Sequence, residues 1–122
     1  MEKKILVVDD DPNICELVSI ALSTKGYSVN AAQTGLEGIK EVETFLPDLV
    51  LLDMTLPDME GIDVAKKIKS IESGKKVPIV MMSGRGLSWS DVDSTLFAGI
   101  LNKPFSLADL TKEAEKYISD HQ

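Results

Sequence analysis

The chain has 122 residues, 43% of them apolar, so its size suits one domain with one substantial core and excludes a second. Twenty acidic residues oppose thirteen basic ones, giving a formal charge of −7, which argues against direct binding to DNA, RNA or an anionic membrane. There is no secretory or membrane-spanning run, so we expect a cytoplasmic location. The single cysteine, Cys15, excludes an internal disulfide and is interpreted as a small residue on the flank of a helix.

Five short apolar runs alternate with segments of helical periodicity. Continuous apolar runs are typical of parallel strands that are covered on both faces. The predicted strands are residues 5–8, 28–31, 49–52, 78–82 and 99–102. We therefore predict an α/β fold: a three-layer, doubly wound, five-stranded parallel sheet of order 2-1-3-4-5 in a single domain, residues 1–122, with 119–122 as a frayed tail that holds a solvated His121.

The first two predicted helices follow the first two strands. Pro12 suits the first position of one helix and Gly26 its C-terminal cap. Thr34 and Glu37 have the spacing of a capping box at the start of the next helix, which ends before Pro47. The apolar stripe of the first helix consists of Ile14, Leu17, Val18, Ala21 and Leu22.

Two further helices are predicted in the second half of the chain, with a doubtful one between them. A helix over about residues 62–71 turns Ile62, Ala65 and Ile68 inward. Glycine and serine are frequent over residues 84–91, which predicts a short, displaced or irregular element there. The last helix starts at Ser106 with Asp109 three residues on, and carries Leu107, Leu110, Ala114, Tyr117 and Ile118.

Polar residues follow four of the predicted strands. In an open parallel sheet the ligand site lies beyond the carboxyl ends of the strands, where the strand order reverses. If strands one and three are neighbours, Asp9, Asp10 and Asp53 lie together there. Strand four ends at Ser83 and strand five at Lys103.

Three carboxylates at one point repel one another unless they are protonated or hold a cation. Oxygen ligands with one or two direct carboxylates suit Mg²⁺, so Asp10 and Asp53 are the expected direct ligands and Asp9 acts through a water. The alternative is that residues 9–11 cap the first helix, an interpretation we adopt for Asp11.

Asp53 ends an apolar run, where burial of an acid is unfavourable, so its presence there suggests a functional role. A carboxylate can attack a phosphoryl group and form an acyl phosphate. Magnesium and Lys103 would neutralise charge on the phosphoryl oxygens, and the Ser83 hydroxyl could donate a hydrogen bond to one of these oxygens. Taken singly, Ser83 could instead be a turn residue and Lys103 a surface lysine.

Four motifs together carry a resemblance to a known family. They are residues 5–12 (ILVVDDDP), 47–54 (PDLVLLDM), 56–61 (LPDMEG) and 103–105 (KPF). Over nearly its whole length the chain thus resembles the receiver domain of two-component response regulators, which have a flavodoxin-like fold. The resemblance implies that Asp53 accepts a phosphoryl group from a phosphohistidine on a histidine kinase or phosphotransfer protein.

The resemblance also implies roles for the residues around Asp53. Asp9 and Asp10 would be the magnesium acids and the backbone carbonyl of Thr55 a further ligand. Lys103 would contact the phosphoryl group, and the bond before Pro104 would be cis. Ser83 would be the hydroxyl that moves onto the phosphate, with Gly84 as the small residue after it. A downstream protein would bind the face formed by the fourth helix, fifth strand and fifth helix.

Two features depart from the family pattern. The position three before Lys103 is usually aromatic, whereas here it is Ile100. Phe97 and Trp89 are the nearest aromatic residues, and we expect both to serve ordinary packing. The stretch from Ser83 to Lys103 is also shorter than usual, so the fourth helix is where residues are missing.

Because the receiver resemblance takes up almost all of the 122 residues, we expect a stand-alone receiver, a phosphorelay shuttle or a protein-binding switch, whose output comes from a partner. It would catalyse only its own aspartyl phosphorylation and dephosphorylation. Thr55 and Arg85 would lie near the water that hydrolyses the acyl phosphate. One alternative is a pseudo-receiver that binds partners constitutively. A flavin carrier would need a glycine- and hydroxyl-rich phosphate loop in place of residues 9–11, and a turnover hydrolase would need a second base.

Overall fold

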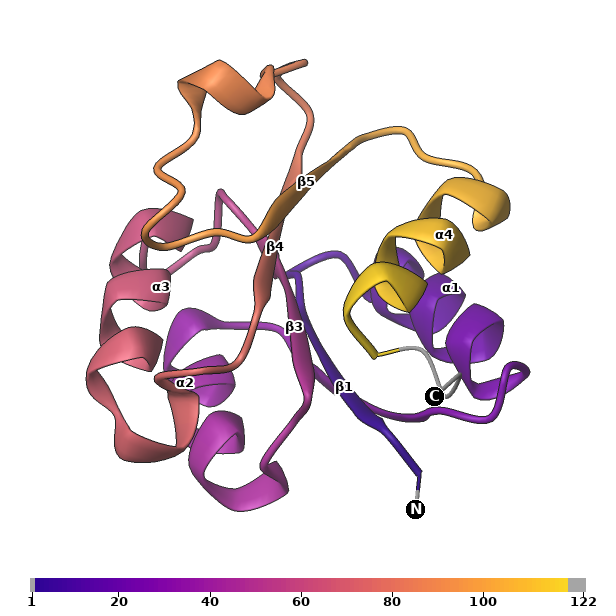
Figure 1. Ribbon diagram of the computed structural model, residues 1–122, viewed down its shortest axis with the longest axis horizontal. Coiled ribbons are helices and arrows are strands. Elements are labelled where there is room, and N and C mark those ends of the chain that lie inside the picture. Colours follow the sequence, from indigo (N-terminus) through magenta and orange to yellow (C-terminus); the bar gives the residue numbers. More distant parts are fainter. Residues whose placement is uncertain (1, 119–122) are drawn as a thin grey trace.

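The computed structural model describes residues 2–118, and it confirms the predicted doubly wound sheet. All five strands are parallel and lie in the order β2-β1-β3-β4-β5 (Figure 1). Each begins or ends within one residue of the run that predicted it. The strands are β1 (Lys4–Val8), β2 (Ser28–Ala32), β3 (Leu49–Asp53), β4 (Ile79–Ser83) and β5 (Gly99–Asn102).

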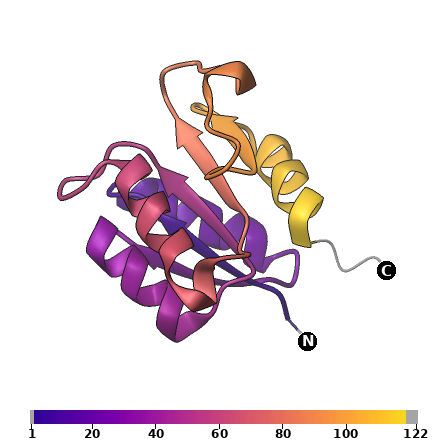
Figure 2. The same cartoon turned by 60° about the vertical axis from the view of Figure 1, so that its left-hand side comes forward.

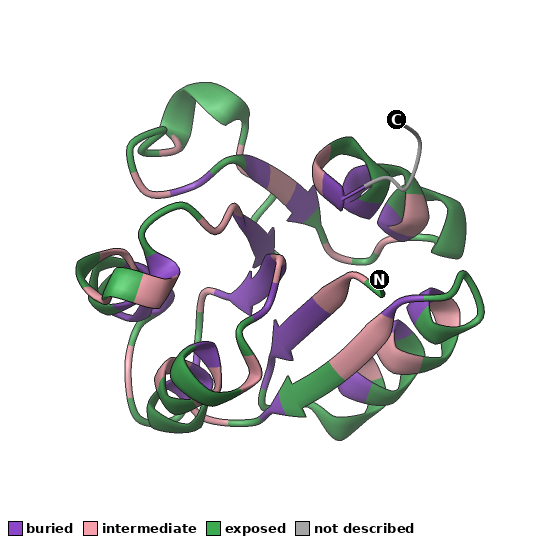
Figure 3. Ribbon diagram, turned by 60° about the horizontal axis from the view of Figure 1, so that its bottom comes forward, coloured by how far each residue is buried: buried purple, intermediate pink, exposed green. Residues whose placement is uncertain are grey.

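Helices cover both faces of the sheet, so the molecule has three layers. The helices α1 (Pro12–Ser23) and α4 (Leu107–Ile118) pack on one face, and α2 (Gly35–Phe45) and α3 (Gly61–Ser70) pack on the other (Figures 1 and 2). Each face has its own cluster of buried apolar residues, and strand residues alternate between the two clusters. Buried residues therefore line the strands and the inner helix faces, while the outer helix faces are exposed (Figure 3).

The segment between β4 and β5 has no α-helix, as the glycines and serines there predicted. Residues 84–98, called here the β4–β5 segment, contain only the 3₁₀ helix η2 (Trp89–Asp91), and a second 3₁₀ helix, η1 (Glu72–Gly74), follows α3. The part around η2 stands beyond the carboxyl end of β4 (Figures 1 and 2), and the chain then runs back to Ala98, whose N–H donates to the carbonyl of Ile79 at the start of β4. Leu87, Val92 and Leu96 attach it to the core on the α2–α3 side.

Four apolar residues that were predicted to pack against the core are exposed. Ile62 is 46% exposed, because α3 begins at Gly61 and buries the stripe that includes Val64 and Ile68, which leaves Ile62 on the outer side. Trp89 is 45% exposed, since η2 lies away from the sheet, whereas Phe97 is buried as expected. Two residues named in the predicted helix stripes are also exposed: Leu17 and Leu107.

The predicted helix caps hold with two adjustments. Asp11 caps α1 by accepting the Asn13 N–H, and Ser106 and Asp109 form a reciprocal capping box at α4. At α2, Thr34 caps as predicted, but Glu37 accepts from the N–H of residue 33 rather than from the cap itself. At the other end of α1, the cap is residue 24, and the glycine at 26 takes positive φ (97°) two residues later, where the chain turns back toward the sheet.

The strand register brings the predicted site residues to one edge of the sheet. Val8 of β1 pairs with Leu52 of β3, so the residues that follow each strand lie side by side. Ser83 at the end of β4 pairs with Asn102 of β5. Within residues 2–118 no helix has the length and apolar character needed to cross a bilayer. The predicted tail at 119–122, including His121, lies outside the described residues.

Candidate functional site

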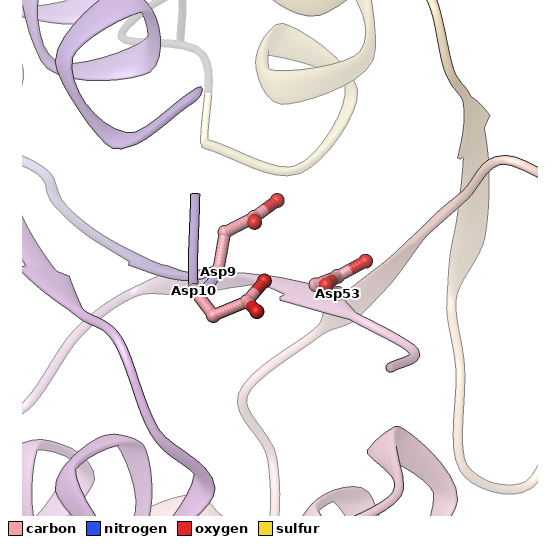
Figure 4. Close-up of side chains that lie close together, drawn as sticks. All are labelled: Asp9, Asp10 and Asp53. Atoms are coloured by element: carbon pink, nitrogen blue, oxygen red, sulfur yellow. The ribbon is translucent and has the colours of Figure 1, made fainter. Parts of the chain in front are cut away.

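Three carboxylates meet at the carboxyl edge of the sheet, as their places after β1 and β3 predicted. Asp9 and Asp10 follow β1, and Asp53 is the last residue of β3 (Figure 4). One carboxylate oxygen from each lies within 4.8 Å of the others. Asp9 is fully buried and Asp53 nearly so, whereas Asp10 is exposed. The cluster is therefore an acidic pocket that opens to solvent on the side of Asp10, and it could hold a metal ion.

Lys103, the residue directly after the carboxyl end of β5, supplies a positive charge to this pocket. Its Nζ lies 2.7 Å from Oδ2 of Asp9 and 3.3 Å from Oδ1 of Asp53. Burial disfavours the charged amine, but the hydrogen bond and charge of Asp9, followed by those of Asp53, outweigh burial and raise the pKa of Lys103. The peptide bond that follows Lys103 is cis, as the resemblance implied. Lys103 is thus part of the site and not a solvated surface lysine.

The carboxylate of Asp53 is held in an environment that resists its ionisation. Burial is the largest cause, the charge of Asp9 adds to it, and together they raise the pKa of Asp53 against the opposing effect of Lys103. A cation bound beside Asp53 would oppose both causes, because it favours the charged carboxylate. A cation in this pocket would therefore be bound favourably, because it would stabilise the ionised carboxylate of Asp53.

Both oxygens of Asp9 already have partners. Oδ1 accepts the N–H of Asp11 at 2.9 Å, and Oδ2 accepts from Lys103. The thiol of Cys15, on α1, donates to the Asp9 backbone carbonyl at 3.3 Å. Burial, followed by the charge of Asp9, raises the pKa of that thiol, so Cys15 is a buried support beneath the site and not a residue of the helix flank alone. Asp9 is better placed to orient the site than to bind a cation directly.

Ser83 is buried at the end of β4, and its Oγ accepts the N–H of Arg85 at 3.1 Å. This is the turn role that the sequence left open. The Ser83 carbonyl also accepts the N–H of Lys103, which ties the ends of β4 and β5 together. Ile100, at the position where the family usually has an aromatic residue, is partly buried against the core on the α2–α3 side.

The β3–α3 loop, residues 54–60, is folded back on itself beside Asp53. Thr55 and Glu60 form an antiparallel bridge, and the N–H of Gly61 donates to the Met54 carbonyl at 2.9 Å. A side chain at Gly61 would place its Cβ 2.7 Å from Cα of Met54 and 2.8 Å from the carbonyl oxygen of Asp53. Only glycine allows the loop to close this tightly.

Asp58, at the tip of this loop, is a residue whose role the sequence analysis missed. Its Oδ1 accepts the N–H of Gly35 at 2.7 Å and its Oδ2 accepts the N–H of Leu36 at 3.0 Å. These bonds favour the ionised carboxylate and hold the pKa of Asp58 below its usual value. Backbone N–H donors belong to nearly every residue, so the sequence carries no signal for this contact.

Comparison with known proteins identifies the family. The family model described as the response regulator receiver domain matches residues 5–115. The chain belongs to this family, as the motifs implied. The DNA-binding response regulator MtrA of Mycolicibacterium smegmatis is 42% identical over 85 residues, which cover 70% of this chain and 36% of MtrA. The chain spans less than half the length of MtrA and of other curated relatives that it matches.

Solved structures of receivers share the fold over nearly the whole chain. The chemotaxis response regulator CheY4 of Vibrio cholerae superposes with a TM-score of 0.90 at 27% identity, covering 97% of this chain and 100% of CheY4. The receiver domain of the sensor histidine kinase PA1611 of Pseudomonas aeruginosa has a TM-score of 0.85 at 25% identity, with 96% and 98% coverage. The PA1611 structure contains a magnesium ion coordinated in its active-site cleft.

These comparisons bear on the alternatives left open by the sequence. The chain is a receiver of the two-component type, and nothing in the matches favours a constitutive pseudo-receiver. The expectation that the chain avoids nucleic acid stays a prediction, because MtrA is described as DNA-binding.

Proposed function

We propose that this chain accepts a phosphoryl group on Asp53 from a phosphohistidine of a histidine kinase or phosphotransfer protein, and that the modification changes its binding to a downstream protein. The observation that carries the proposal is the meeting of Asp9, Asp10, Asp53 and Lys103 at one edge of the sheet. Phosphoryl transfer to a carboxylate needs a nucleophilic oxygen and positive charge for the phosphoryl oxygens. Asp53 would supply the first, and Lys103 together with a cation held by the acids would supply the second. Residues 1–122 form one receiver domain in this proposal.

The donor set fits Mg²⁺. Three carboxylates lie within 4.8 Å of one another, and the ammonium of Lys103 contacts those of Asp9 and Asp53, so the pocket keeps an excess of negative charge on hard oxygen donors. Asp10, Asp53 and the backbone carbonyl of Thr55 would hold the ion, with Asp9 acting through a water. When bound, Mg²⁺ supplies charge that offsets the phosphoryl oxygens. The magnesium ion of the similar PA1611 receiver supports this choice of metal.

The chain's own residues account for the transfer step. An oxygen of the Asp53 carboxylate forms a bond to phosphorus while the bond from phosphorus to the imidazole nitrogen breaks. The electron pair of that bond stays on the donor histidine. Lys103, 3.3 Å from Asp53, is placed to pair with a phosphoryl oxygen. The Ser83 hydroxyl accepts from Arg85 and still has its own proton to donate to the phosphoryl group.

The modified residue would influence a face on the same side of the molecule. The β4–β5 segment begins directly after Ser83, and Lys103 lies between β5 and α4 in the chain. A groove runs between β5 and α4. We assign this face to the downstream partner. In this proposal the chain acts on no other substrate and catalyses only the phosphorylation and dephosphorylation of Asp53, with Thr55 and Arg85 beside the attacking water.

The proposal is tested by phosphorylating the purified protein with acetyl phosphate in the presence of Mg²⁺. Intact-mass spectrometry should show one added phosphoryl group, and peptide mapping should place it on Asp53. Asp53→Asn or a chelator should abolish the addition, while Asp63→Asn, an acid in the first turn of α3, should leave it unchanged. An unmodified wild-type protein, under conditions that load another receiver, would contradict the proposal.

A further inference from the structure

The contact between Asp58 and α2 links two elements that are distant in sequence. The carboxylate of Asp58 accepts from Gly35 and Leu36, which lie 23 and 22 residues earlier in the chain. Asp58 is exposed, yet both of its oxygens have a backbone N–H partner. We call this contact the Asp58 clasp.

The clasp is not needed to begin α2. Thr34 is the N-cap of this helix and its Oγ accepts the N–H of Glu37 at 3.1 Å, while the Glu37 side chain accepts the N–H of Gln33 at 3.0 Å. The helix thus has a side-chain cap from its own segment. Asp58 accepts from Gly35 and Leu36, the two first-turn N–H groups that lie between Thr34 and Glu37 and that this cap leaves free. The contact therefore serves the β3–α3 loop at least as much as it serves α2.

The β3–α3 loop is held both at its base and at its tip. Its base is closed by the bridge between Thr55 and Glu60 and by the bond from Gly61 to the Met54 carbonyl. Its tip also packs on α2, since a Cβ at Gly35 would lie 3.0 Å from the sulfur of Met59. A short loop closed at its base and fixed at its tip leaves Thr55 little room to shift.

We propose that Asp58 is a positioning residue for the metal site: by clasping the N-terminus of α2 it fixes the β3–α3 loop and, through it, the backbone carbonyl of Thr55. Asp58 would touch neither the metal ion nor the phosphoryl group. Removing the clasp would release the loop tip. Binding of the metal ion would then have to order the Thr55 carbonyl, and the free energy of that ordering would lower the metal affinity. The inference rests on the proposed function, because it assumes that Thr55 is a ligand.

The experiment measures Mg²⁺ binding by following the amide NMR resonances of residues 9–11 and 53–56 during titration at constant ionic strength. Asp58→Ala should weaken Mg²⁺ binding roughly tenfold, the size of effect typical of groups that support metal ligands. Asp58→Asn keeps one acceptor oxygen and should lose less. The matched control is Glu60→Gln, which removes one negative charge from the same loop at an exposed residue whose side chain does not cap α3. It should stay within about twofold of the wild type.

A second arm removes the clasp from the helix side. Leu36→Pro deletes the N–H that donates to Oδ2 of Asp58, at a first-turn position that tolerates proline and carries a side chain that is 67% exposed. It should weaken Mg²⁺ binding in the wild type and add nothing in the Asp58→Ala background, because the two changes break the same contact. This arm also decides the matter if Asp58→Ala does not fold.

The outcomes test the positioning role of Asp58 separately from the proposed function on which it rests. A wild-type protein that does not bind Mg²⁺ would contradict the proposed function itself. If the wild type binds Mg²⁺ and the Asp58→Ala and Leu36→Pro variants bind it with the same affinity as the wild type, only the positioning role of Asp58 is overturned. Equal losses in Asp58→Ala and Glu60→Gln would also overturn it, since they would show an effect of charge and not of the clasp.

Discussion

Two connections leave the same edge of the sheet and differ in how they are held. The β3–α3 loop is fixed by groups on other elements: Asp58 bonds to α2, and Gly61 at the start of α3 bonds back to Met54. The β4–β5 segment forms hydrogen bonds largely within itself, such as those from Ser88 to Asp91. The side-chain amide of Asn102 ties it to β5 by donating to the Leu87 carbonyl at 3.2 Å.

The difference matches what each connection is proposed to do. A metal site needs ligands fixed to within a fraction of an ångström, and the β3–α3 loop is held by hydrogen bonds at its tip and at its base. A surface that reports a modification needs two arrangements of similar free energy, and a polar segment with its own turns can change its position without breaking a helix. We therefore expect changes in the two connections to have unequal effects.

The largest expected effect is on folding stability, from a matched pair of glycines. Gly61→Ala places a Cβ against the backbone of Met54 and Asp53, so we expect the free energy of unfolding in urea to fall by about 3 kcal/mol. Gly84→Ala, in the β4–β5 segment, meets no atom within 4 Å and should change it by less than about 1 kcal/mol. Losses of equal size would show that the two connections are equally constrained.

A smaller effect of opposite sign is expected at Asp53. Burial and the charge of Asp9 raise its pKa, so ionised Asp53 destabilises the metal-free protein. Asp53→Asn should raise the free energy of unfolding at neutral pH, in the presence of a chelator, by on the order of 1 kcal/mol. The control Asp63→Asn should change it by less than about 0.5 kcal/mol.

The pH dependence gives the sign of this effect independently. Since the pKa of Asp53 is higher in the folded than in the unfolded protein, the wild type loses stability as pH rises from the unfolded pKa of about 4 through the folded value. The advantage of Asp53→Asn should therefore shrink as pH falls toward about 4. A difference that is constant with pH would point to packing and not to charge.

The smallest expected effect is at the tie between β5 and the β4–β5 segment. Asn102→Ala removes one exposed hydrogen bond to Leu87 and should cost only about 0.5 kcal/mol of unfolding free energy. The fluorescence of Trp89, the single tryptophan, should nevertheless change, because it lies in the released segment. Phosphorylation by acetyl phosphate should match the wild type.

A matched control for this change is Asn30→Ala, which removes a comparable exposed bond from β2 to Glu41 at the opposite edge of the sheet. It should leave Trp89 fluorescence unaltered. A loss of phosphorylation in Asn102→Ala would show that the β4–β5 segment and the acidic pocket are not separable.

The sheet and the pocket could be predicted because their signals are local in the sequence. Apolar runs define the strands, right-handed crossovers limit their order, and the residue after a strand must lie at the carboxyl edge. Asp9, Asp53 and Lys103 could therefore be brought together from their positions alone.

The remaining features depend on where elements pack, which a periodicity does not determine. Ile62 fits an apolar stripe but lies on the exposed side, because the position of the α3 start decides which face is buried. Trp89 is apolar and exposed, because the segment that carries it stands off the sheet. The Asp58 clasp joins a side chain to backbone amides 22 and 23 residues away, and no residue type marks such amides.

The bridging position of Lys103 implies an order of events. Asp9, Asp10, Asp53 and Lys103 give the pocket a formal charge of −2, which repels any phosphorylated donor that approaches. One divalent cation would make the pocket neutral, and the donor's phosphoryl group would then meet no net opposition. If Asp53 is phosphorylated as proposed, a cation would therefore bind before the donor, and the rate of phosphorylation should rise with cation concentration.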